Sequence, residues 1–288
     1  MNLIYTGISD EGAPGLKEQI NLHRQLGWNS LELRSIDGKN ICEMPDRDFD
    51  EAFEIISEEG FSVAGFGSSI ANWSRPVTGD FNIDKQDLMR AAPRMHKLKT
   101  PFLRIMSYTQ GEASDQEWAE KAISRVLELT RMAEGEGITL IHENCDGWAS
   151  SKPENMARML DAIPSKALKI VFDMGNPRSH GHPEEAVFDF LKVCKERIVH
   201  IHIKDCYLNE KNEDIHCFPG EGECHVYDIV ETMVKEQNFR GYISIEPHMV
   251  FQFHKNREKN GEADTKKAAN YLAYGRKTMA LLSGLEKE

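Results

Sequence analysis

The sequence predicts a (β/α)8 barrel, and three observations support this fold class. Short apolar runs rich in β-branched residues recur along the 288 residues, as expected for buried parallel strands. They alternate strictly with longer stretches of helical periodicity, eight of each. Each of the last four runs ends in a carboxylate or an imidazole, and the carboxyl ends of the strands in such a barrel meet at one face. We therefore expect one α/β domain, a TIM barrel, over residues 1–288.

The first half of the chain supplies four of the eight units. Gly60 and Gly137 mark two of the predicted helix ends, because glycine readily adopts the left-handed conformation that closes a helix. The expected strands are 3–9, 30–34, 61–66 and 102–106, and the expected helices are 15–27, 47–60, 84–98 and 115–136.

The second half supplies the other four units, and no linker or break in composition separates it from the first. A doubly wound sheet is the alternative, but it brings the last four strand ends together less readily. Two connections, 206–224 and 248–263, are longer than a barrel needs. We expect both to overhang the active site as lids, with an ordinary surface loop as the alternative for the second. The expected strands are 138–143, 168–173, 198–202 and 241–246, and the expected helices are 153–162, 183–196, 225–237 and 264–284.

Composition excludes several classes of partner. A net charge of −12 argues against binding nucleic acid, which requires a basic face. No apolar run approaches the roughly 18 residues that span a bilayer, and the first residues do not resemble a signal peptide. The six cysteines form no CxxC pair, which indicates reduced thiols and a cytoplasmic location. A homo-oligomer remains open.

Four strand-end residues predict a metal site. Glu143, Asp173, His202 and Glu246 close the last four apolar runs, so a barrel brings them together. A single acidic residue in such a place is ordinarily a turn or helix-cap residue. Four in successive units, after strands with almost no other charge, favour a mixed oxygen and nitrogen site. We expect one divalent ion there, Mn²⁺ first, with Mg²⁺, Co²⁺ and Zn²⁺ as alternatives.

The order of these motifs resembles a known family. Glu143, the segments 172–176 (Phe-Asp-Met-Gly-Asn) and 200–205 (His-Ile-His-Ile-Lys-Asp), and Glu246 are similar to the sugar phosphate isomerase/epimerase family. This group of xylose-isomerase-like barrels includes tagatose 3-epimerase, hydroxypyruvate isomerase and inosose dehydratase. The resemblance implies one divalent ion held by all four residues, with Glu143 and Glu246 also catalytic as acid/base groups on opposite faces of the substrate.

That chemistry predicts a metal-dependent isomerase or epimerase of carbohydrate metabolism. A metal bound to a carbonyl and its neighbouring hydroxyl stabilises an enediolate, and a carboxylate removes or returns the α-proton. The substrate is expected to be a small sugar or polyol. Three positions depart from the family's epimerases, which have a histidine, a glutamate and an arginine where this chain has Asn176, Ala149 and Leu208. The sugar identity therefore does not transfer.

Other residues are candidates for substrate contact or for supporting the ligands. His142 allows two interpretations: it packs behind its strand, or a bulge turns it into the site as a base. The second keeps a lyase in view, either a keto-inositol dehydratase or an elimination on a keto sugar like that of the C-glycoside deglycosidases. A non-catalytic sugar-binding barrel and an enzyme like endonuclease IV rank lower, given the intact metal residues and the acidic charge. The candidates are His142, Asn176, His200, Lys204, Arg34 and His248.

Overall fold

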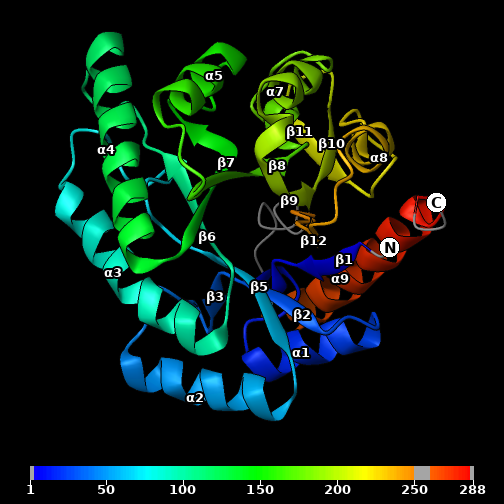
Figure 1. Ribbon diagram of the computed structural model, residues 1–288. Helices are drawn as coiled ribbons and strands as arrows, with labels where there is room; N and C mark the ends of the chain where they lie inside the picture. Colours follow the sequence, from blue (N-terminus) through cyan, green and yellow to red (C-terminus); the bar gives the residue numbers. More distant parts are fainter. Residues whose placement is uncertain (1–2, 250–259, 286–288) are drawn as a thin grey trace.

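A computed structural model describes residues 3–249 and 260–285, and it confirms the predicted barrel. Eight parallel strands form one sheet in the order β1-β12-β9-β8-β7-β6-β5-β2 (Figure 1). An isolated parallel bridge between Ile8 and Glu32 joins the two ends of this order, so the barrel is nearly closed. The strands are β1 (Ile4–Gly7), β2 (Ser30–Leu33), β5 (Ser62–Gly67), β6 (Phe102–Ser107), β7 (Thr139–Gly147), β8 (Leu168–Asp173), β9 (Ile198–Ile203) and β12 (Tyr242–Ile245).

The helices surround the barrel and cover the outward faces of its strands (Figure 1). From α2 to α7 neighbouring helices contact one another, and α9 contacts both α1 and α8. The helices are α1 (Leu16–Gln25), α2 (Asp46–Glu58), α3 (Phe81–Leu98), α4 (Asp115–Glu136), α5 (Pro153–Ala162), α6 (Asn176–Ser179), α7 (Ala186–Cys194), α8 (Val226–Glu236) and α9 (Asn260–Leu282).

Local sequence signals explain where the elements begin and end. The hydroxyl of Ser114 accepts a hydrogen bond from the Glu117 amide at 3.3 Å and caps α4. The same helix stops at Gly137, which has a φ of +68°. Between these ends, apolar side chains recur every three or four residues and are buried against the sheet. They are Ala119, Ala122, Val126, Leu129 and Ala133.

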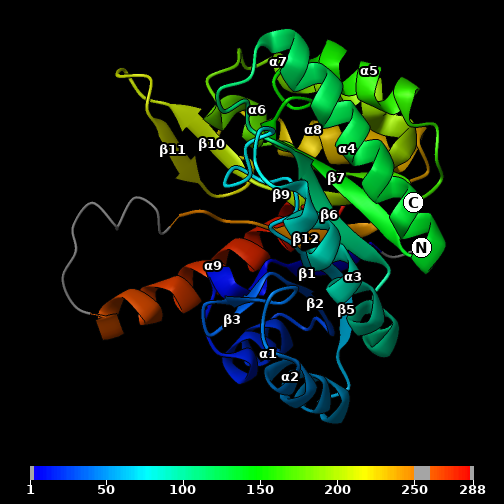
Figure 2. The same cartoon turned by 90° about the vertical axis from the view of Figure 1, so that its left-hand side faces the viewer.

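Three short elements were not predicted. A hairpin of β3 (Ser35–Ile36) and β4 (Lys39–Asn40) follows β2, and α6 follows β8. A second hairpin, β10 (Asp205–Leu208) and β11 (Asp214–Cys217), begins one residue before the predicted lid 206–224 and forms its first half as an ordered ribbon. Figure 2 shows this hairpin extending from the barrel. Its turn is built by the Asn209 side chain, which accepts hydrogen bonds from two backbone amides ahead of it.

Two further expectations concern the second predicted lid and membrane-spanning helices. Most of the second predicted lid, 248–263, lies outside the described residues, so its role as a lid stays a prediction. Among the described helices, none is long and apolar enough to cross a membrane.

Candidate active site

The structure brings together the four residues predicted to bind a metal. Glu143 lies in β7, Asp173 ends β8, His202 lies in β9, and Glu246 directly follows β12. All four are buried, and one ligand atom from each lies within 4.8 Å of the others. We call these four residues the quartet.

Three ligand atoms of the quartet make no hydrogen bond with the described residues, although two of them lie close to the Lys204 ammonium. His202 Nδ1 lies 3.5 Å from Glu143 Oε1, 3.5 Å from Glu246 Oε2 and 3.8 Å from Asp173 Oδ2. His202 Nδ1, Asp173 Oδ2 and Glu246 Oε2 are buried and make no hydrogen bond within the described part of the chain. Burying such atoms is costly unless something binds them. Their convergence, and their mixed nitrogen and oxygen chemistry, fit a divalent cation.

Lys204 is the cation nearest to these atoms. Its ammonium lies 2.7 Å from Glu246 Oε2 and 3.0 Å from Asp173 Oδ2, and it donates a hydrogen bond to Asn176 Oδ1 at 2.9 Å. Burial lowers the pKa of Lys204, but the surrounding carboxylates outweigh this and hold the pKa well above its ordinary value. The charged lysine therefore offsets part of the negative charge of the quartet.

Two neighbours fix Glu143. Arg104 lies 3.0 Å from its Oε2, and the Asn176 side-chain amide donates to its Oε1 at 3.1 Å. Burial raises the pKa of Glu143, but the Arg104 charge and the contact with His202 together outweigh this and bring the pKa to about 2. Nearby positive charge offsets the burial of Asp173 less well. Burial raises the pKa of Asp173 to about 7, and Lys204 is the chief opposing charge. The two carboxyl groups therefore differ in charge near neutral pH.

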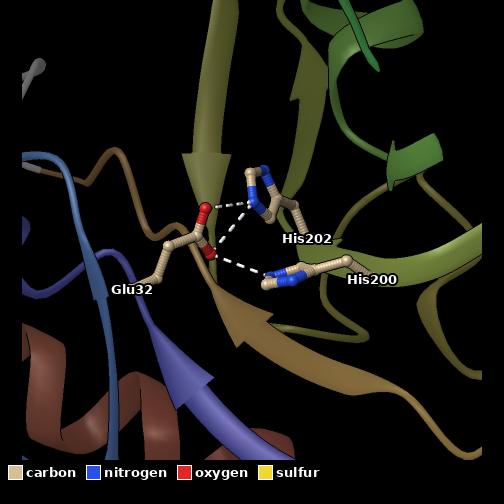
Figure 3. Close-up of side chains that lie close together, drawn as sticks. All are labelled: Glu32, His200 and His202. Carbon is tan, nitrogen blue, oxygen red and sulfur yellow. Dashed lines mark hydrogen bonds and ion pairs between the residues drawn. The ribbon is translucent and has the colours of Figure 1, made fainter. Parts of the chain in front are cut away.

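Glu32, in β2, is a central residue that the sequence analysis missed. Its carboxylate lies 2.9 Å from His200 Nε2 and 3.1 Å from His202 Nε2, and it accepts a hydrogen bond from the Ser244 hydroxyl at 2.5 Å. Figure 3 shows both rings turned toward this one carboxylate. By holding His202 Nε2, Glu32 directs Nδ1 of the same ring toward the quartet. The only sequence signal was a charged residue between two leucines of a short strand.

A second missed contact involves Glu11, which lies beside His248. His248 Nε2 is 3.0 Å from Glu246 Oε1 and 3.1 Å from Glu11 Oε1. Arg34, another predicted candidate, lies 3.6 Å from Glu246 Oε1 and 3.0 Å from Asp10. Burial lowers the pKa of His248, but Glu11 and Glu246 outweigh this and raise it to about 9.

His142 does not join the quartet. It is fully buried between its strand neighbours Ile105 and Ile170, and neither ring nitrogen has a hydrogen-bond partner among the described residues. Burial lowers its pKa to about 4, so the ring is neutral at ordinary pH. This placement matches the interpretation in which His142 packs behind its strand.

A cavity of about 600 Å³ opens over the quartet. This volume lies within the range of small-molecule sites, and its position at the strand ends is where barrel enzymes bind their substrates. The lining next to the quartet consists of Arg34, Arg104, Cys145, Asn176, Lys204 and His248.

A family model described as the xylose isomerase-like TIM barrel matches residues 20–274. The chain belongs to this family. An uncharacterized protein of Methanocaldococcus jannaschii is 33% identical over 126 residues, which is 43% of this chain and 41% of that protein. An inosose dehydratase of Mesomycoplasma hyopneumoniae is 24% identical over 163 residues, which is 52% of this chain and 48% of that protein. The chain thus matches less than half the length of each curated relative.

Solved structures share the fold over nearly the whole chain. A structure of the IolI protein with a bound zinc atom has a TM-score of 0.72 and 14% identity, covering 99% of this chain and 100% of that one. A D-tagatose 3-epimerase-like protein has a TM-score of 0.65 and 20% identity, covering 96% and 100%. The structural neighbours of this chain therefore include an epimerase-like protein and a protein that binds a metal.

Proposed function

We propose that the protein is a divalent-metal-dependent isomerase or epimerase that moves a proton next to the carbonyl of a small sugar or polyol-derived ketone. One observation carries the proposal: four buried ligand atoms lie within 4.8 Å of one another under a cavity, and three of these four residues carry an atom that makes no hydrogen bond with described residues. A cation held there, with Mn²⁺ our first choice, would supply Lewis-acid stabilisation of negative charge on the substrate oxygens.

The roles of the residues follow from their contacts. Asp173 and His202 serve as ligands, because both are fully buried and neither lines the cavity. Glu143 and Glu246 both line the cavity, so each carboxylate can bind the ion and also face the substrate. We assign the removal and return of the α-proton to this pair.

Three cationic or polar side chains complete the site. Lys204, Arg104 and Asn176 line the cavity beside the glutamates and can donate hydrogen bonds to substrate hydroxyls. These donors lie close to where negative charge would develop on the substrate. Preorganised donors in such a place lower the activation barrier most.

A dehydratase is the second candidate. The inosose dehydratase relative favours it, since dehydration next to a ketone starts with the same proton removal. His142 no longer supports this alternative, because it does not line the cavity. Lys204 and His248 line the cavity beside Glu246, and either could supply the acid that protonates a leaving hydroxyl.

Solvent isotope exchange tests the shared step. The full-length protein, with Mn²⁺ and in D₂O, is incubated with a panel of ketoses and keto-inositols, and deuterium at the α-carbon is followed by NMR. We expect metal-dependent incorporation, and a loss of at least about 10²-fold in Glu246→Gln. Glu43→Gln is the matched control, since Glu43 lines the cavity outside the quartet. Loss of water from the substrate would identify the dehydratase, whereas exchange that is absent, or equal in both variants, would refute the proposal.

A further inference from the structure

Trp73 is an exposed aromatic residue in an otherwise polar setting. It lines the cavity above the quartet, and 52% of its surface is exposed. The other large hydrophobic side chains exposed in the described residues, Ile4, Ile83, Met89 and Tyr207, do not line this cavity. Its indole N–H also donates to no residue that the structure describes. Trp73 therefore stands where the cavity meets solvent.

The loop that carries Trp73 is firmly held. Ala71 has a φ of +58°, a conformation that costs a residue with a Cβ about 1–2 kcal/mol. Its amide donates to Asp84 at 3.2 Å, and the Tyr108 amide donates to its carbonyl at 2.7 Å. Arg75, two residues after the indole, pairs with Asp84 at 3.3 Å and with Asp87 at 2.8 Å. Strain of this kind persists only where the surroundings enforce it.

The exposure of Trp73 is therefore a property of an ordered loop. An indole left in water forgoes the stabilisation that burial of its large apolar surface would give. A loop built by several hydrogen bonds and ion pairs that still directs the ring outward indicates a binding surface.

The neighbouring groups indicate what binds there. An indole face carries a negative quadrupole, which attracts the electropositive C–H groups on the face of a pyranose ring. Asn40 and Ser69 line the same cavity and can bond the hydroxyls at the edge of such a ring. A protein partner would need a contiguous apolar patch, which these polar neighbours interrupt. An aromatic ligand without hydroxyl groups would leave the same polar side chains without hydrogen-bond partners.

The size of the cavity agrees with a second ring. Pockets of about 600 Å³ bury drug-sized molecules, so one sugar ring beside the quartet leaves room near the indole. We propose that Trp73 stacks on a second pyranose ring, and that the ligand is a disaccharide whose first ring lies over the quartet. The position of the reacting ring rests on the proposed function, but the stacking itself does not.

Binding measurements on the full-length, Zn²⁺-loaded protein test this subsite. The probes are D-glucose, cellobiose, maltose, sucrose and phenyl β-D-glucoside, and the readouts are calorimetric affinity and quenching of tryptophan fluorescence by acrylamide. Trp28 and Trp148 are buried and Trp118 is only partly exposed, so protection from acrylamide reports mainly on Trp73, and Trp118→Phe removes the remaining contribution. We expect at least one disaccharide to bind at least tenfold more tightly than D-glucose and to protect the fluorescence.

Variants assign the effect to the indole. Trp73→Ala should abolish the tenfold preference, Trp73→Phe should retain most of it, and Trp118→Phe should leave it unchanged. The proposal is overturned if no disaccharide exceeds D-glucose, if Trp73→Ala keeps the preference, or if only the phenyl glucoside gives protection. A disaccharide preference without isotope exchange would refute the proposed isomerase activity but support the Trp73 subsite. Isotope exchange on monosaccharides without a disaccharide preference would support the isomerase activity but refute the subsite.

Discussion

Replacing Glu32 by glutamine should weaken metal binding although Glu32 is outside the quartet. Three donors meet its carboxylate: His200 Nε2, His202 Nε2 and the Ser244 hydroxyl. A glutamine has one acceptor oxygen, and its amide N–H₂ would face at least one of the imidazole N–H groups. Because Glu32 is buried, water cannot relieve this mismatch. The His202 ring would then lose the contact that directs Nδ1 toward the quartet.

The expected magnitude follows from these contacts. Loss of the partner that orients a metal-binding histidine typically lowers affinity by about 10–100-fold, or roughly 1.4–2.8 kcal/mol. A buried donor left unmatched costs about 1–3 kcal/mol, so the free energy of unfolding should fall by a similar amount. Calorimetric titration with Mn²⁺ at pH 8 measures the first effect, and denaturant unfolding of the metal-free protein measures the second. Glu43→Gln, which removes a carboxylate from the cavity rim, is the control. A folded Glu32→Gln protein that binds Mn²⁺ within twofold of wild type would refute the reasoning.

Two further predictions concern the quartet. Because the pKa of Asp173 is about 7 and that of His202 lies well above its ordinary value, protons occupy both groups below neutral pH. Mn²⁺ affinity should therefore rise from pH 6 to pH 8, because the ion must displace these protons. Calorimetry in buffers of different ionisation enthalpy measures the proton release, and a pH-independent affinity would contradict this prediction. Asp173→Asn keeps an oxygen that can accept from the Gly175 and Asn176 amides but loses the charge facing the ion, so it should weaken Mn²⁺ binding and regain part of its activity at high Mn²⁺. If it is inert at full occupancy, Asp173 takes part in the chemistry.

The barrel and the convergence of the quartet could be predicted because both depend on the strand-helix repeat. A residue that ends a parallel strand reaches the catalytic face whatever the details of the connecting loops. Glu32 could not be placed in this way. It meets His200 and His202 across the barrel, 168 and 170 residues away in the sequence, and no local pattern encodes that distance. The contact between Glu11 and His248 likewise depends on barrel closure, because the two residues follow β1 and β12, which pair only in the folded sheet.

Loop features were missed for a different reason. The hairpin of β10 and β11 is too short for an alternating pattern, and its turn depends on hydrogen bonds that the Asn209 side chain accepts from backbone amides. Trp73 would be assigned to the core from its hydrophobicity alone. Its exposure follows from the left-handed Ala71 and the ion pairs of Arg75, which only the folded loop reveals.

The two glutamates of the quartet are not equivalent, although the sequence placed them symmetrically. Glu143 contacts Arg104, which cannot accept a proton, and the amide group of Asn176. Glu246 instead contacts Lys204 and His248, which are both titratable and both line the cavity. His248 lines the cavity beside Glu246, so once it has released its own proton to solvent it can take the one held by Glu246. Among the described residues, the side chains that hydrogen-bond or ion-pair with Glu143 are Arg104, Asn176 and the His202 imidazole, which the quartet itself employs. We infer that deuterium from solvent enters the substrate from the face of Glu246. The stereochemistry of the labelled carbon in the exchange experiment decides this, because a label delivered from the face of Glu143 would reverse the assignment.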